Sequence, residues 1–227
     1  MRNDKTKERL NKISGAALFS ALAYLCVFFF HFIKVGGFLT FDAKDTFLVM
    51  CGMTFGPAFG VISTLIVTFL EFITISGTGP YGFLMNFVSS ASFVFFASLI
   101  YKYRRSYQGA IVGLITSVFA MTAVMMGMNL LVTPRYTGMS ASDVAAMIPT
   151  VLLPFNLTKA VLNAGLSLLL YKPVSSALRR AKLVPAKDGS KPKARYTVIS
   201  TVAAILIIAA AVLCFIFVLN GKFSLVR

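Results

Sequence analysis

The feature that most constrains the fold is a series of long apolar segments that recurs along the 227 residues. Several of them reach about 18 residues or more with almost no charge, which is the length an α-helix needs to cross a bilayer. Only 13% of the residues are charged, whereas soluble domains carry about 25%. The alternating strands of an outer-membrane barrel are absent. The sequence therefore predicts an all-α protein that spans a membrane several times.

The apolar segments predict a bundle of six transmembrane helices and one extra helix near the C-terminus. Gly56-Pro57 is a turn signal between the second and third helices, and the fifth helix is expected to end before Pro134. The predicted helices span 13 to 33, about 46 to 55, 58 to 75, 81 to 101, 109 to 132, about 150 to 171, and 197 to 219. The corresponding regions are a basic tail (1 to 12), a six-helix membrane domain (13 to 172), a basic linker (173 to 196) and a C-terminal helix with a short tail (197 to 227).

Lysine and arginine predict the orientation of these helices. Most of the 22 basic residues lie in the N-terminal tail, in the loop after the fourth helix and in the linker after the sixth. With six helices before the linker, all three segments fall on one side of the membrane, which the positive-inside rule assigns to the cytoplasm. The net charge of +15 follows from this topology and from attraction to anionic lipid headgroups, so nucleic acid is not needed to explain it.

Polar side chains inside the apolar segments are the candidates for function, because a lysine at the centre of a membrane helix costs about 2.5–3.5 kcal/mol. Asn156, Lys159 and Asn163 are spaced to share one face of the sixth helix. Residues at a similar predicted depth in three other helices are Glu71, Asn86 and Asn129. We interpret these groups as the walls of a pocket that opens outward and suits a flat ring with a polar edge.

Simpler interpretations of these residues stay open. Lys159 is about two turns from the outer end of its helix, so its ammonium could extend to the headgroups. Each amide taken alone is typical of a hydrogen bond between helices. Glu71 could instead pair with Lys159.

The first outer loop, KVGGFLTFDAKD (34 to 45), is unusually apolar for a segment in water. We interpret it as a lid over the pocket, with packing against neighbouring helix ends as the alternative. P-loop, HExxH and GxSxG motifs are absent and the cysteines have no metal-binding spacing, so neither an enzyme nor a metal site is predicted. A binding unit of this kind needs an ion gradient or a partner. Ala17 and Ala21, four apart on the first helix, would allow a partner helix to approach closely.

Five segments occur in the order of a known family, namely FLTFDAKD, FGPAFG, GPYGFLMNFVSSASF, MNLLVTPRY and LLPFNLTKAVLNAGLSLLLYKP. Over about residues 10 to 180 the chain resembles the riboflavin-specific substrate-binding (S) component of energy-coupling factor (ECF) transporters. The resemblance implies a six-helix fold in a prokaryotic cell membrane that binds riboflavin from the outside under a lid. It implies a transmembrane coupling subunit and two ATPase subunits as partners, and no cofactor.

The same resemblance implies roles for individual residues. Asn129, Asn156 and Lys159 would hydrogen-bond the vitamin, and Ala17 and Ala21 would contact the coupling subunit. The lid residues would be Leu39, Thr40, Phe41 and Asp42. Asn86 is added to the substrate-binding set from its depth in the fourth helix, whereas Asn163, Glu71 and the helix at 197 to 219 match no family position.

Several functions stay open at this point. Flavin mononucleotide is a second ligand that a lysine in the pocket could accept. The alternatives to riboflavin uptake are an ECF component for another vitamin, a gradient-driven transporter, and a membrane scaffold that holds partners through the basic linker.

Overall fold

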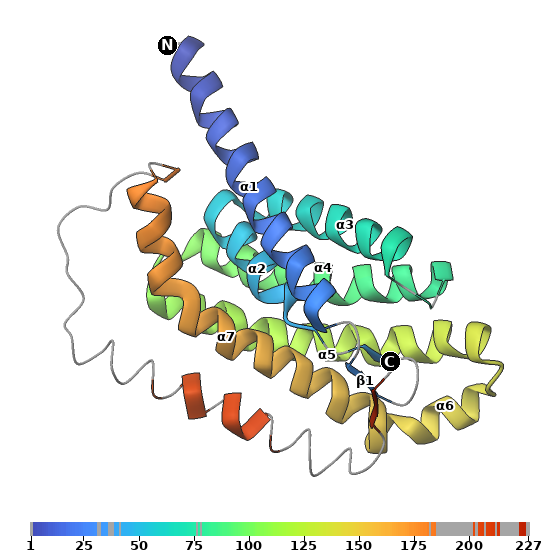
Figure 1. The fold of residues 1–227 in the computed structure, drawn as a ribbon. Helices are drawn as coiled ribbons and strands as arrows, with labels where there is room; N and C mark the ends of the chain where they lie inside the picture. The colour runs from blue at the N-terminus through green and yellow to red at the C-terminus, as the bar shows by residue number, and fades with distance from the viewer. Residues whose placement is uncertain are drawn as a thin grey trace.

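The computed structural model describes residues 2–30, 33–35, 39–40, 42–75, 77, 79–181 and 183–184, and short stretches between 202 and 225. These residues form a bundle of α-helices with three short strands at one end (Figure 1). The elements are α1 (Arg2–Phe30), β1 (Ile33–Val35), β2 (Leu39–Thr40), α2 (Lys44–Phe55), α3 (Pro57–Thr74), α4 (Gly79–Tyr103), α5 (Tyr107–Thr137), α6 (Ala141–Met147), the π-helix η1 (Ile148–Leu152), α7 (Leu153–Arg180) and β3 (Phe223–Leu225).

The predicted all-α class is confirmed, and the six predicted helices of the bundle correspond to α1 to α5 and α7. Within the described residues, five helical segments are long and apolar enough to cross a membrane. Of the six helices that correspond to the predicted bundle, α2 is too short to cross a membrane. Its 12 residues extend about 18 Å at 1.5 Å per residue, which is less than the thickness of the bilayer core. The predicted helix at 197 to 219 lies largely outside the described residues.

The predicted end of the fifth helix before Pro134 is wrong, because α5 continues through Pro134 to Thr137. A proline removes one backbone donor, a loss that membrane helices tolerate where neighbouring groups compensate. The helix ends where Gly138 adopts a φ of 74° and its N–H donates to the Pro134 carbonyl at 3.2 Å. In the same way α7 contains Pro173 and runs past the predicted end near residue 171 to Arg180.

The predicted turn at Gly56-Pro57 is confirmed and brings α2 and α3 into close contact. Gly56 has a φ of 110°, which favours glycine, and Pro57 occupies the first turn of α3. Further along, a Cβ placed on Gly60 would lie 2.7 Å from the Cα of Gly52. The two helices therefore pack with backbone against backbone, and α2 sits deep in the bundle.

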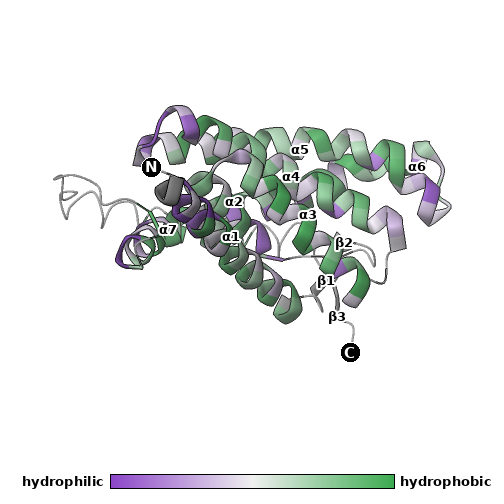
Figure 2. Ribbon diagram, turned by 90° about the horizontal axis from the view of Figure 1, so that it is seen from above, coloured by the Kyte–Doolittle hydropathy of each residue, from purple (hydrophilic) through white to green (hydrophobic). Residues whose placement is uncertain are grey.

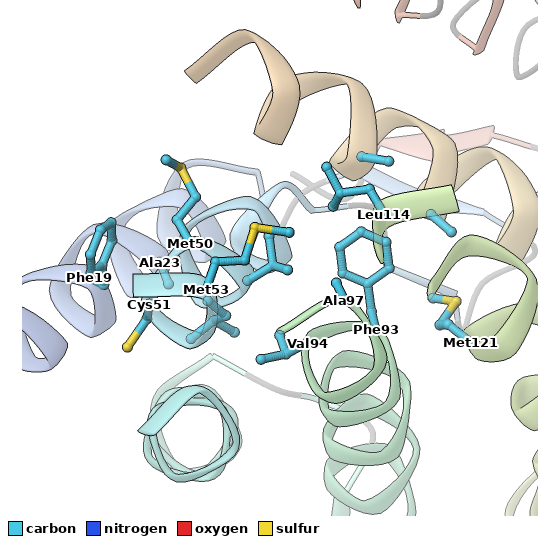
Figure 3. Close-up of a cluster of buried hydrophobic side chains, with 14 of the residues drawn as sticks. Phe19, Ala23, Met50, Cys51, Met53, Phe93, Val94, Ala97, Leu114 and Met121 are labelled. Atoms are coloured by element: carbon cyan, nitrogen blue, oxygen red, sulfur yellow. The ribbon is translucent and has the colours of Figure 1, made fainter. Parts of the chain in front are cut away.

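Buried apolar side chains from α1, α2, α4 and α5 fill the interior (Figure 3). The labelled members are Phe19, Ala23, Met50, Cys51, Met53, Phe93, Val94, Ala97, Leu114 and Met121. The outer surface is apolar as well, since Ile66, Phe69 and Ile73 on α3 are about half exposed. Figure 2 shows hydrophobic residues along most of the long helices. Helices that are hydrophobic on all sides are typical of a protein surrounded by lipid.

The three strands form a small sheet in the order β2-β1-β3. β1 pairs antiparallel with β2 within the first loop, and on its other edge it pairs with β3, where Ile33 lies opposite Leu225. Because β1 follows the end of α1, the C-terminal strand lies at the opposite end of α1 from the N-terminus. The first turns of α1 project beyond the other helices (Figure 1).

Candidate functional site

The polar face predicted on the sixth helix points into the bundle. Asn156, Lys159 and Asn163 on α7 are 2%, 3% and 0% exposed. The ammonium of Lys159 therefore does not extend to the headgroups, and it needs a counter-ion inside the protein.

Asp42 supplies that counter-ion from the segment just before α2. Lys159 Nζ donates to Asp42 Oδ2 at 2.9 Å, and the Asp42 side chain is fully buried. Burial by itself raises the pKa of Asp42, but the ammonium groups of Lys159 and Lys44 outweigh it and lower the pKa to about 2. The carboxyl is therefore ionised at neutral pH, and the pair joins the predicted lid segment to α7.

Lys44 lies at the centre of a second set of contacts. Its Nζ donates to Asp42 Oδ2 at 3.3 Å, to Glu71 Oε2 at 2.8 Å and to Asn86 Oδ1 at 3.0 Å. The amide of Asn86 in turn donates to Glu71 Oε1 at 2.6 Å. The predicted pairing of Glu71 with Lys159 is therefore wrong, because Glu71 on α3 faces the N-terminus of α2, where Lys44 is nearer.

Asn163 fastens the start of α2 to α7. Its Oδ1 accepts from the Thr46 backbone N–H at 3.0 Å and from the Thr46 hydroxyl at 3.0 Å, and its Nδ2 donates to the Asp42 carbonyl at 3.2 Å. Ala43 occupies the N-cap of α2 and has no side chain that could accept from the first turn. A residue 117 positions away thus caps the helix and holds the backbone of Asp42.

Asn129 and Asn156 each donate to a backbone carbonyl one helical turn earlier in the chain. The Asn129 amide donates to the Met125 carbonyl at 2.7 Å, and its Oδ1 accepts from Thr133 at 3.0 Å. The Asn156 amide donates at 2.8 Å to Leu152, the last residue of η1. Wide π-turns occur often at functional sites, and η1 directly precedes the helix that carries Asn156.

The remaining predicted residues belong to the predicted lid and to the face of α1 predicted to contact a partner helix. Leu39 and Thr40 form β2, while Phe41 is outside the described residues. Ala17 and Ala21 lie on an exposed face of α1. No group of three metal-binding side chains occurs in the described part of the chain.

The sequence reasoning missed the roles of Lys44 and Asp45, which it placed in an outer loop. Both are buried in the first turn of α2. Among the described residues, Asp45 Oδ1 and the Ser90 hydroxyl on α4 are the buried polar atoms without a hydrogen-bond partner. The sequence did contain a signal, namely three charged residues in DAKD next to an apolar helix. Burying such charges is costly, so they need partners inside the protein.

Comparison with known proteins gives a consistent result. A family model for the substrate-specific component of ECF transporters matches residues 11–171. The riboflavin transporter RibU of Staphylococcus aureus (strain TCH60) is 31% identical over 185 residues, 78% of this chain and 96% of that protein. The riboflavin transporter FmnP of Bacillus subtilis (strain 168) is 26% identical over 164 residues, 67% of this chain and 86% of that protein. A solved structure of the S component of a bacterial ECF transporter matches with a TM-score of 0.64 and 29% identity over 75% of this chain and 98% of that one.

The helical bundle, its apolar exterior and its buried polar interior define a multi-pass membrane protein of the transporter class. The family match covers more than half of the chain and agrees with the structural likeness. This chain therefore belongs to the substrate-specific components of ECF transporters, which are transport subunits.

Proposed function

We propose that this protein is the riboflavin-binding S component of an ECF transporter and captures the vitamin from outside the cell. The observation that carries the proposal is the 31% identity to a riboflavin transporter over 96% of that protein's length. The second relative, which is also a riboflavin transporter, supports the same ligand.

The chemistry of the polar interior suits this ligand. Riboflavin has a flat apolar ring with a polar imide edge and a chain of hydroxyl groups. An ammonium has three donors, and Lys159 donates one hydrogen bond within the described residues, to Asp42. Lys159 therefore has donors left for a carbonyl or hydroxyl of the vitamin, and Asn129 and Asn156 add buried amides from α5 and α7. In this proposal Leu39, Thr40, Phe41 and Asp42 close over the ring.

The chain contains no nucleotide-binding P-loop, so in this proposal ATP is hydrolysed by separate subunits. We propose a transmembrane coupling subunit that packs on Ala17 and Ala21 and two ATPase subunits that supply the energy. The exposed small side chains on α1 support close helix contact there. The basic tail at residues 1 to 12 supports a cytoplasmic N-terminus.

The direct test is titration of the purified full-length protein with riboflavin, followed by quenching of flavin fluorescence. We expect saturable quenching at one vitamin per chain, and mass spectrometry of the molecule that co-purifies should give the mass of riboflavin. A different vitamin mass together with unquenched flavin would assign another substrate. Uptake into vesicles that lack the ATPase subunits would favour a gradient-driven transporter instead.

A further inference from the structure

Five ionisable side chains meet inside the bundle, and we call them the buried ion cluster. Each is no more than 5% exposed, and they come from the segment before α2 and from α2, α3 and α7. The members are Asp42, Lys44, Asp45, Glu71 and Lys159. With all five ionised, three carboxylates face two ammonium groups, and the cluster has one surplus negative charge. An uncompensated charge is strongly unfavourable so far from water, so the cluster needs one more positive charge.

The hydrogen bonds show which carboxylate is left without compensation. Asp42 accepts from both ammonium groups, at 2.9 Å from Lys159 and at 3.3 Å from Lys44. Glu71 accepts from Lys44 at 2.8 Å. Within the described residues Asp45 takes part in no ion pair, and its Oδ1 atom accepts no hydrogen bond. The surplus charge therefore belongs to Asp45.

The two lysines are already matched by other carboxylates. Both ammonium groups interact electrostatically with the Asp45 carboxyl. Lys44, however, uses its three donors on Asp42, on Glu71 and on an amide of α4. Lys159 donates to Asp42 within the described residues. Neither lysine thus gives Asp45 a hydrogen-bonded counter-ion of its own.

The elements packed around the start of α2 add no further positive charge within the described residues. Glu71 on α3 and Asp42 before α2 are acidic. The titratable group of α1 near this site is the Cys26 thiol, which interacts with Asp42 and is uncharged at neutral pH. α4 contributes Ser90, which is fully buried and has no charge.

Ser90 is the other buried polar group that lacks a partner. Its hydroxyl lies close enough to act on the Asp45 carboxyl, yet the two groups are not in hydrogen-bonding geometry. Buried polar atoms in proteins almost always have a partner, so two neighbouring exceptions indicate that a third group belongs between them. A proton meets both needs, because it removes the surplus charge and creates an O–H that can donate to the Ser90 oxygen.

We propose that Asp45 is a proton-binding site, so that the folded protein holds one proton on Asp45 at neutral pH, directed at Ser90 Oγ, and the buried ion cluster is neutral. In the unfolded chain Asp45 is in water and ionises like an ordinary aspartate, with a pKa of about 3.9. The folded state therefore binds one proton more than the unfolded state at this site. Raising the pH then favours unfolding.

Infrared spectroscopy of the full-length protein at neutral pH, in a detergent without ester groups, tests the proposal directly. A protonated carboxylic acid has a carbonyl band that is separate from the bands of carboxylates, and the chain has only 7 acidic residues that could give one. We expect this band in the wild type and its loss in Asp45→Asn. The matched control is Asp143→Asn, which makes the same change at an exposed carboxylate of α6 and should keep the band.

Ser90→Ala keeps the test decisive if Asp45→Asn does not fold. It removes the proposed acceptor without changing any charge. The band should remain and move to higher frequency, because the carboxylic acid has lost its hydrogen bond.

Thermal unfolding between about pH 5 and pH 8 gives a second measurement. The midpoint temperature of the wild type should fall as the pH rises. In Asp45→Asn, whose amide is neutral at every pH, this dependence should become much weaker, whereas Asp143→Asn should keep it.

Several results would overturn the proton site. They are a wild type without the band, a band that survives in Asp45→Asn, and a band that does not move in Ser90→Ala. A midpoint that depends on sodium concentration and not on pH would assign a sodium ion to Asp45 in place of the proton. None of these measurements uses a flavin, so their outcome is independent of the proposed function.

Discussion

Asn163 on α7 accepts a hydrogen bond at 3.0 Å from the backbone N–H of Thr46, in the first turn of α2. The first N–H groups of a helix have no partner within it, and here the N-cap is an alanine. In an apolar interior no water replaces a missing cap. The side chain of Asn163 thus supports the short helix that carries Lys44 and Asp45.

Replacing Asn163 by alanine should destabilise the protein by about 1–3 kcal/mol, since it removes the side-chain donor to the Asp42 carbonyl and leaves the Thr46 N–H with only the Ala43 carbonyl at 3.3 Å. Thermal unfolding in detergent would measure the lower midpoint temperature. Ser142→Ala, a polar truncation on the exposed side of α6, should leave the midpoint nearly unchanged. Equal midpoints for the two variants would mean that Asn163 does not cap α2.

Lys44→Met should lower the free energy of unfolding more than Asn163→Ala does, because it leaves the buried carboxylates of Asp42 and Glu71 with less positive charge to neutralise them. Removing one member of a buried ion pair typically costs about 3–5 kcal/mol, whereas removing both members often costs much less. Lys44→Met/Glu71→Gln should therefore unfold at a higher temperature than Lys44→Met. A double variant less stable than the single one would contradict the pairing at 2.8 Å between Lys44 and Glu71.

Asn129→Ala and Asn156→Ala should each weaken riboflavin binding by about 1–3 kcal/mol, the cost of an unpaired buried polar group in the complex. Fluorescence quenching titrations would give the dissociation constants. Ser92→Ala is a suitable control, because the Ser92 hydroxyl donates within α4 and its loss removes no proposed ligand contact. Wild-type affinity in both asparagine variants would refute their proposed contact with the vitamin.

Ala17→Leu should leave riboflavin binding unchanged and block uptake, because a large side chain prevents close approach of the coupling subunit to α1. Uptake of labelled riboflavin into vesicles containing all subunits is the measurement. Ala123→Leu adds the same bulk on an exposed position of α5 and should transport normally. Loss of transport in both variants would point to a general effect of bulk at the lipid surface.

The sequence was a good guide to the helices and a partial guide to the site. The inward face of Asn156, Lys159 and Asn163 followed from helical spacing, which is a local property. The role of Lys44 did not, because its charge next to a loop is equally typical of a solvated residue. The prediction for Pro134 failed for a related reason, since the cost of a proline depends on what surrounds the helix.

The sequence by itself determined the membrane class, the positions of the six helices of the bundle and the family, because apolar length and residue order are properties of the chain alone. Only the tertiary structure decided which charges meet. Lys159 and Asp42 are 117 positions apart, and Lys44 and Glu71 are 27 apart. Their pairing depends on how α2, α3 and α7 pack, and in a medium of low polarity that packing determines which ions neutralise one another.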